Sequence, residues 1–276
     1  MGRQGRDERA GTVDEGEERK QEMNGTVLLQ VKELCKSFGG LAAVQNVSFG
    51  IKAKEIVSLI GPNGAGKTTV FNLLSGVYSP NSGEIWLEGE NLAGRKPFEI
   101  CQRGVGRTFQ IMQPFPHMTV LENVMTSGLF GRRLKGTMGE VEKESIELCH
   151  LVGLGDKQKV FPRNLTVADQ KRIEIARALA VKPKLLLLDE VMSGLTPTET
   201  GEAIKLVRRL RDQGTTIFLI EHVMRVVMGI SDRVIVLHHG EKIAEGASGE
   251  VANDPRVIEA YLGEAIDESE EGSCSS

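Results

Sequence analysis

The fold of this chain is decided by one short segment, Gly61-Pro62-Asn63-Gly64-Ala65-Gly66-Lys67-Thr68-Thr69. It fits the pattern G-x-x-x-x-G-K-[ST], with an apolar strand expected at 55–60 before it and a helix at 66–75. The glycines let successive backbone N–H groups converge on phosphate oxygens, and the helix N-terminus adds partial positive charge. Lys67 supplies a full charge for the β- and γ-phosphates, and the Thr68 hydroxyl is suited to bind Mg²⁺. The segment predicts a nucleoside triphosphate site to which every residue quoted contributes.

A second segment places two carboxylates at the end of an apolar run, Leu185 to Leu188. The run predicts a buried parallel strand whose carboxyl end lies beside the phosphate-binding loop. Asp189 is then placed to hold the Mg²⁺ shell. Glu190 is placed to orient and deprotonate the attacking water, a general-base role worth about 10²–10⁴-fold in rate. The alternative is that Asp189 caps a helix and Glu190 is solvated, but the neighbouring phosphate loop favours the catalytic interpretation.

The order of the expected elements indicates an α/β fold. Further strands are expected at 27–32, 47–51, 84–88, 185–188, 215–220 and 233–237. Further helices are expected at 119–125, 139–152, 170–180 and 198–213. Strands that alternate with helices predict a parallel sheet with helices on its faces. The helix-rich middle of the chain interrupts this alternation as an insertion.

Bulk composition is that of an ordinary globular protein, with 40% hydrophobic and 26% charged residues among 276. The net charge of −4 argues against nucleic acid as the main partner, because nucleic-acid binding usually requires a basic face. The four cysteines stand far apart and suggest neither a zinc site nor a disulfide framework. No run approaches the roughly 18 apolar residues of a membrane span. Residues 1–25 and 264–276 are poor in large apolar residues, and we expect both to be disordered tails.

A resemblance to a known family rests on three further segments, Ser37-Phe38-Gly39-Gly40, Arg107-Thr108-Phe109-Gln110 and Ile220-Glu221-His222. With the two motifs above, they resemble the ABC ATPases over nearly all of residues 26–263. The resemblance implies that Phe38 stacks on adenine, that Gln110 senses Mg²⁺ and the γ-phosphate, and that His222 contacts the γ-phosphate. Without the resemblance, a single Phe is more often a core residue, and a single His is usually a surface or core residue whose hydrogen bonds are satisfied.

The same resemblance implies the architecture and the catalytic set. The expected fold is a P-loop NTPase (RecA-like) core with a β-rich N-terminal subdomain and an inserted helical subdomain at about 112–181. The domain spans 26–263. Glu190, His222 and Gln110 are the expected catalytic residues, with ATP and Mg²⁺ as cofactors. The metal would be held by Thr68, Gln110 and Asp189.

The family signature, usually Leu-Ser-Gly-Gly-Gln, reads here Leu165-Thr166-Val167-Ala168-Asp169-Gln170. The resemblance implies that Thr166 and Ala168 contact the ATP of a second ATPase subunit. Thr166 and Asp169 also fit a capping box at the start of a helix. We expect the Asp169 carboxylate to lie where the partner's γ-phosphate arrives and to repel it, and the Cβ of Ala168 to hold that phosphate away or to strain the loop. A half-site that binds ATP and hydrolyses it weakly therefore stays open.

Segments 118–124, 194–200 and 253–263 resemble the ATPases of branched-chain amino-acid importers. The implied partners are membrane-spanning permease subunits, a second ATPase subunit in a homo- or heterodimer, and a substrate-binding protein. The implied location is peripheral, at the cytoplasmic face of the cell (inner) membrane, with the apolar segment 111–120 as the docking surface or as core. Urea, other small amides and lipopolysaccharide stay open as cargo. An ABC ATPase that acts on ribosomes or nucleic acid is disfavoured, because the chain has one P-loop and no coiled-coil insertion.

Overall fold

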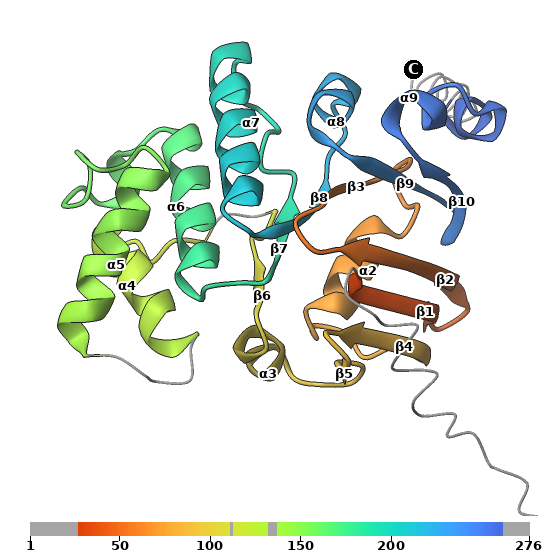
Figure 1. The fold of residues 1–276 in the computed structure, drawn as a ribbon, viewed down its shortest axis with the longest axis horizontal. Helices are drawn as coiled ribbons and strands as arrows, with labels where there is room; N and C mark the ends of the chain where they lie inside the picture. Colours follow the sequence, from red (N-terminus) through yellow and green to blue (C-terminus); the bar gives the residue numbers. More distant parts are fainter. Residues whose placement is uncertain (1–26, 111–112, 132–136, 262–276) are drawn as a thin grey trace, which may run out of the picture.

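The computed structural model describes residues 27–110, 113–131 and 137–261 (Figure 1). Its strands form a six-stranded sheet of order β10-β9-β3-β8-β7-β6 and a four-stranded sheet of order β2-β1-β4-β5. The strands are β1 (Val27–Phe38), β2 (Leu41–Lys52), β3 (Ile56–Ile60), β4 (Ser82–Leu87), β5 (Glu90–Asn91), β6 (Val105–Arg107), β7 (Leu185–Asp189), β8 (Thr216–Ile220), β9 (Arg233–His238) and β10 (Glu241–Gly246).

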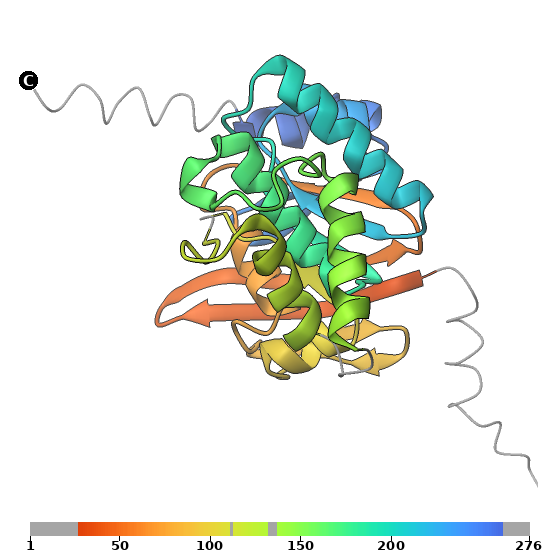
Figure 2. The same cartoon turned by 90° about the vertical axis from the view of Figure 1, so that its left-hand side faces the viewer.

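The labelled helices are α2 (Lys67–Leu74), α3 (Pro97–Gln102), α4 (Val120–Phe130), α5 (Met138–Leu151), α6 (Val167–Ala180), α7 (Pro197–Asp212), α8 (Met224–Ile230) and α9 (Ser248–Val251), with a 3₁₀ turn at Pro162–Asn164. Residues 255–261 are also helical. In Figure 1, α4, α5 and α6 form one end of the molecule, and the two sheets form the other. The quarter turn in Figure 2 brings α4 and α5 to the front, with the strands behind them. Among the described residues, none of these helices is long and apolar enough to cross a membrane.

The central strands β3, β7, β8 and β9 of the six-stranded sheet are buried on both faces, which explains their apolar runs. In β7, Leu185 and Leu187 belong to one core cluster, together with β1, β2 and α2. Leu186 and Leu188 point to the opposite face and join a second cluster with α4, α6 and α7. Alternate side chains of a strand point to opposite faces, so four successive leucines fill two different cores. Helix α2 and the antiparallel sheet thus cover one face, and α6, α7 and α8 cover the other.

The strands that carry the motifs end at one edge of this sheet. β3, β8, β7 and β6 are parallel neighbours, and Ile220 pairs with Leu59 on one side and with Asp189 on the other. The carboxyl ends of parallel strands therefore meet at this edge, where ligands of open α/β sheets bind. The predicted α/β fold with a parallel sheet is confirmed. The two tails lie outside the described residues, and the limits of the helical subdomain stay a prediction.

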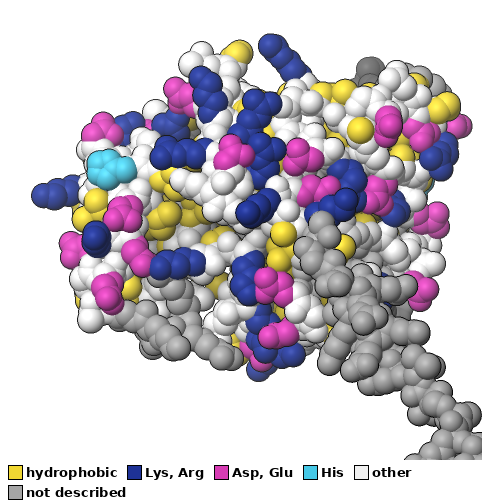
Figure 3. Space-filling view, in the orientation of Figure 1, with side chains coloured by type: hydrophobic (Ala, Val, Ile, Leu, Met, Phe, Trp, Pro, Cys, Tyr) yellow, Lys and Arg dark blue, Asp and Glu magenta, His cyan; other side chains and the backbone are white. Residues whose placement is uncertain are grey.

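Several elements differ from the sequence prediction. The strands expected at 27–32 and 47–51 are parts of β1 and β2, which pair with each other through several irregularities in register. The short elements α3, β6, α8 and α9 and the edge strand β10 were not predicted. The helices among them have at most seven residues, too few to show a helical period, and β6 and β10 lack the continuous apolar run of β7, so their tertiary neighbours define them. On the face seen in Figure 3, acidic and basic side chains are interspersed.

Candidate active site

The phosphate-binding loop connects β3 to α2 and curls around the Lys67 side chain. The Lys67 ammonium donates to the carbonyl oxygens of Gly61 at 2.6 Å and Pro62 at 2.7 Å. Gly66 has φ 99° and is the N-cap of α2, so its left-handed conformation turns the chain into the helix. The side chain of Lys67 is buried at the start of a helix, where the helix dipole and the ammonium together favour an anion.

Two distant segments press against this loop and require glycine in it. A Cβ on Gly66 would lie 2.4 Å from the Ala43 carbonyl oxygen on β2, and one on Gly61 would lie 2.1 Å from that of Leu237 on β9. The Gly240 N–H, in the turn after β9, donates to the Ala65 oxygen at 3.1 Å. The loop is therefore shaped by β2 and by the β9–β10 turn as well as by its own sequence.

The predicted catalytic residues are in direct contact. Glu190 Oε2 accepts from Gln110 Nε2 at 3.0 Å, and Glu190 Oε1 lies 2.6 Å from His222 Nε2. These residues follow β6, β7 and β8, which are adjacent in the sheet. The Glu190 N–H donates to the Ile220 oxygen at 3.0 Å, and Glu190 has φ 51°. A non-glycine residue held in this region is common at functional sites.

Asp189 has the environment of a cation ligand. Its Oδ2 accepts from Arg107 Nη2 at 3.1 Å, and its N–H donates to Thr108 Oγ1 at 3.0 Å. Its Oδ1 is buried and has no hydrogen-bond partner among the described residues. Burial raises the pKa of Asp189, and the Arg107 charge opposes that rise. A buried carboxylate oxygen left open suits Mg²⁺, a hard cation that prefers oxygen ligands, so the residues fit the metal.

A cavity of about 660 Å³ brings the nucleotide-binding and catalytic residues together. The predicted residues that line it are Phe38, Asn63, Gly64, Ala65, Gly66, Lys67, Thr68, Thr69, Gln110, Glu190 and His222. Gly61 and Pro62 meet the site through Lys67, while Asp189 lines the adjoining groove with Thr68 and Gln110. Phe38 forms a wall of the cavity, with its ring 5.1 Å from that of Tyr78 in an edge-on contact. Gln45 and His239, which the sequence did not single out, also line it.

Comparison with known proteins identifies the family. A family model described as ABC transporter matches residues 44–193, and a model of branched-chain amino acid ATP-binding cassette transporters matches residues 241–267. The chain therefore belongs to the ABC transporter ATP-binding family. It is 45% identical to the high-affinity branched-chain amino acid transport ATP-binding protein LivG of Escherichia coli, over 86% of this chain and 98% of that one. It is 40% identical to BraF of Pseudomonas aeruginosa over the same shares.

Solved structures agree with this assignment. The ADP conformation of an ATP-binding cassette of an ABC transporter has a TM-score of 0.79 at 29% identity and covers 87% of this chain and 100% of that one. A nucleotide-free cassette from an ABC transporter has a TM-score of 0.79 at 27% identity, over 85% and 98% of the two chains. The predicted P-loop NTPase core and ABC-type ATPase activity are confirmed.

The altered ABC signature is folded differently from our expectation. Thr166 is the N-cap of α6 and accepts from the Asp169 N–H at 3.2 Å, as predicted. The Asp169 carboxylate, however, is buried and binds Lys157 Nζ at 2.7 Å. The prediction that it faces a partner's phosphate is wrong, because a basic residue outside the segment draws it inward. The idea of charge repulsion, and with it one support for a weak half-site, is removed.

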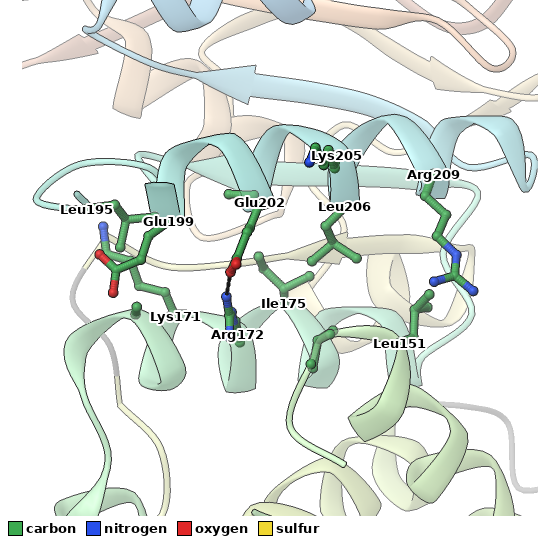
Figure 4. A pocket seen from close by; sticks show the side chains of 14 residues that line it. Leu151, Lys171, Arg172, Ile175, Leu195, Glu199, Glu202, Lys205, Leu206 and Arg209 are labelled. Atoms are coloured by element: carbon green, nitrogen blue, oxygen red, sulfur yellow. Dashed lines mark hydrogen bonds and ion pairs between the residues drawn. The ribbon is translucent and has the colours of Figure 1, made fainter. Parts of the chain in front are cut away.

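Ala168 is the second residue of α6 and is buried. The prediction that its Cβ strains a loop is therefore also wrong. Its side chain faces a cavity of about 410 Å³ between α6 and α7. Figure 4 shows this cavity, with Arg172 of α6 paired to Glu202 of α7 across it. Thr166 and Ala168 do not line the cavity that holds Lys67, and contact with a second subunit's ATP stays a prediction for both.

Lys171, which the sequence prediction left without a role, connects α6 to the catalytic loop. Its ammonium donates to the Glu190 carbonyl at 3.1 Å and to that of Ser193. Burial lowers the pKa of Lys171 and raises that of Glu221, a neighbour that accepts from the Met192 N–H at 3.0 Å. Because Lys171 follows the ABC signature directly, a movement of α6 would be transmitted to the backbone of Glu190. The sequence signal that could have pointed to this role is the pair Lys171-Arg172, which directly follows the signature.

Proposed function

We propose that this chain powers import of branched-chain amino acids by hydrolysing Mg–ATP, as one subunit of an ATPase dimer beneath separate membrane permeases. The relatives named above carry branched-chain amino acid transport in their names and match nearly full length, which supports the cargo. The observation that carries the chemistry is the Glu190 carboxylate, held between Gln110 and His222 beside the phosphate-binding loop. A substrate-binding protein and a position at the cytoplasmic membrane face complete the proposal.

The residues divide the work of hydrolysis. Lys67 and the loop N–H groups bind the phosphates, and Phe38 offers a face to adenine. When bound, Mg²⁺ would be held by Thr68, Gln110 and Asp189 and would neutralise phosphate charge. Both oxygens of Glu190 are engaged by Gln110 and His222. As phosphate enters, these two donors can turn toward it, which frees the carboxylate to take a proton from water.

A second cavity, of about 790 Å³, supports permease docking; we call it the docking groove. Its apolar lining includes Phe98, Phe109 and Phe115, all exposed, and it also contains Gln110 and Asp189. The groove reaches α3 and α6, so it is wider than the expected surface at 111–120. Residues 111–112 lie outside the described residues. A cytoplasmic segment of the permease is the occupant we propose, because the groove joins exposed aromatic rings to the metal and catalytic residues.

The test of the proposed function uses Glu190→Gln, which keeps the size and hydrogen bonding of the side chain but removes the base. Turnover should fall by about 10²–10⁴-fold while ATP binding and an ATP-stabilised dimer on size exclusion persist. Glu202→Gln, an exposed change on α7, is the matched control and should hydrolyse ATP normally. Normal turnover by Glu190→Gln would move the base elsewhere.

The cargo needs a separate experiment. The co-purified complex, with its permeases, is reconstituted in vesicles, and ATP-dependent uptake of labelled leucine is compared with that of labelled urea. Leucine uptake that Glu190→Gln abolishes is the expected result. Urea uptake without leucine uptake would refute the assignment of cargo and leave the assignment of the ATPase intact.

A further inference from the structure

Arg107 lines the docking groove, which shares Thr68 and Gln110 with the nucleotide cavity. It is the last residue of β6 and pairs in register with Leu187 on β7, two residues before Asp189. Its side chain is only 6% exposed, yet it contributes to the groove wall. Burying a guanidinium is costly, so an Arg at such a position needs compensating contacts. Its contacts show what it is placed to do.

The guanidinium is fixed from three directions. Nη1 donates to Asn72 Oδ1 at 2.8 Å and to Ser75 Oγ at 2.6 Å, which ties it to the end of α2. Nη2 donates to Asp189 Oδ2 at 3.1 Å. The rings of Phe71 and Phe109 lie 5.8 and 4.9 Å from its central carbon. A planar group held by hydrogen bonds within its plane and by aromatic rings has little freedom to rotate.

This arrangement leaves the two oxygens of Asp189 with different roles. Oδ2 is occupied by Arg107, whereas Oδ1 is buried without a hydrogen-bond partner among the described residues. The backbone of Asp189 is held as well, through the bond from its N–H to Thr108. Thr68, whose hydroxyl is another proposed metal ligand, lines the docking groove together with Asp189. The contacts of Oδ2 and of the backbone therefore fix the orientation of Oδ1.

We propose that Arg107 is a positioning residue for the magnesium site, where it orients the Asp189 carboxylate so that Oδ1 is presented to the metal of Mg–ATP. The proposal rests on the proposed function, because it assumes that Asp189 binds the metal. The role assigned to Arg107 acts through Asp189 and requires no contact with metal or nucleotide. Outer-shell partners of this kind contribute about 10–100-fold to metal affinity. A lysine would keep the positive charge but not these contacts. The bonds to α2 and to Asp189 come from two different nitrogens of one planar guanidinium.

Arg177 provides a matched control. It also lines the docking groove, and its Nε, like that of Arg107, is buried without a hydrogen-bond partner in the described chain. It stacks near Phe115, with its central carbon 5.0 Å from the ring. Its carboxylate partner is Glu174 at 2.7 Å, and no hydrogen bond or ion pair between Arg177 and Asp189 occurs among the described residues. Arg107→Lys and Arg177→Lys therefore remove the same fork from the same groove, but only the first alters the contact with Asp189.

The experiment measures Mn²⁺ binding to the ATP-loaded chain by electron paramagnetic resonance, and ATP affinity with and without Mg²⁺. Arg107→Lys should weaken Mn²⁺ binding by about 10–100-fold, with little change in ATP affinity without metal. Arg177→Lys should match the parent in both measurements. Circular dichroism verifies folding, and Arg107→Gln repeats the test with a neutral side chain.

Two outcomes would overturn the proposal. One is that Arg107→Lys and Arg107→Gln bind Mn²⁺–ATP as tightly as the parent. The other is an equal loss of ATP affinity with and without metal, which would make Arg107 a support of the phosphate loop. If the parent chain itself fails to bind Mn²⁺–ATP, the proposed function fails, and that result differs from both.

Discussion

Replacing Asp169 by asparagine tests whether the Asp169 side chain of the altered signature is buried against Lys157. The change removes one charge and preserves the shape of the side chain. The carboxylate binds Lys157 at 2.7 Å and lies 3.6 Å from Arg172 Nη1, in the first turn of α6. A charge-assisted hydrogen bond contributes about 1.5–3 kcal/mol. An acidic group at a helix start adds about 0.3–1 kcal/mol.

The solvent exposure of Lys157 makes the expected loss of stability smaller than the sum of these two free energies. The Asp169 side chain is 6% exposed, but that of Lys157 is 37% exposed, so water compensates the lysine when its partner is lost. We expect Asp169→Asn to lower the free energy of unfolding by about 2 kcal/mol. For a domain of this size, that corresponds to a fall in Tm of about 4–8 °C. Because the carboxylate is buried, added salt should change the loss little.

The assay combines urea unfolding without nucleotide and ATP-driven dimerisation in the Glu190→Gln background. Glu202→Gln is the control for stability, because it removes the other partner of Arg172 at a side chain that is 56% exposed. It should cost less than about 1 kcal/mol. Dimer affinity should be the same for Asp169→Asn and its background. An Asp169→Asn protein that unfolds like the parent and dimerises more tightly would refute the reasoning and return the carboxylate to the dimer surface.

Two further changes probe the nucleotide site. Gly66→Ala would place a Cβ 2.4 Å from the Ala43 oxygen. It should therefore destabilise the nucleotide-free chain in a thermal melt far more than Gly64→Ala, because Gly64 also has positive φ but no atom lies within 4 Å of its added Cβ. Equal losses of stability would mean that the Ala43 contact adjusts easily. Phe38→Ala should weaken ATP binding in calorimetry by about 1–3 kcal/mol, the range for stacking on a base. Phe130→Ala, an exposed change on α4, should have no effect. Parent-like affinity in Phe38→Ala would remove the stacking role.

The parts of the fold that could be predicted from the sequence are those with strong local signals. The strand Leu185–Asp189 is continuously apolar, and the helix Pro197–Asp212 opens with a complete capping box at Thr196 and Glu199. By contrast, β6 has three residues, one of them glycine, and is a strand only because it pairs with β7. The extension of β1 to Phe38 likewise depends on pairing with β2. Long-range pairing leaves little trace in a short segment.

The site divides in the same way. The resemblance to the ABC ATPases predicted that Gln110, Glu190 and His222 act together. They are in contact because each follows a strand and the three strands are neighbours. The direction of a side chain could not be predicted. Asp169 turns inward to Lys157, which lies in the irregular stretch between α5 and α6, and Arg107 reaches Asp189 from another strand. Both contacts depend on tertiary packing, which spacing along the sequence does not encode.

The phosphate-binding loop has a consequence for the order in which this protein is made. Its final shape requires the turn at Gly240, whose N–H binds Ala65 and whose carbonyl accepts from Gln45 at 2.8 Å. During synthesis the loop leaves the ribosome many residues before that turn. Domains form as units during synthesis, and contacts distant in sequence form late. The growing chain should therefore be unable to use ATP as a template for its own folding until nearly the whole domain has emerged.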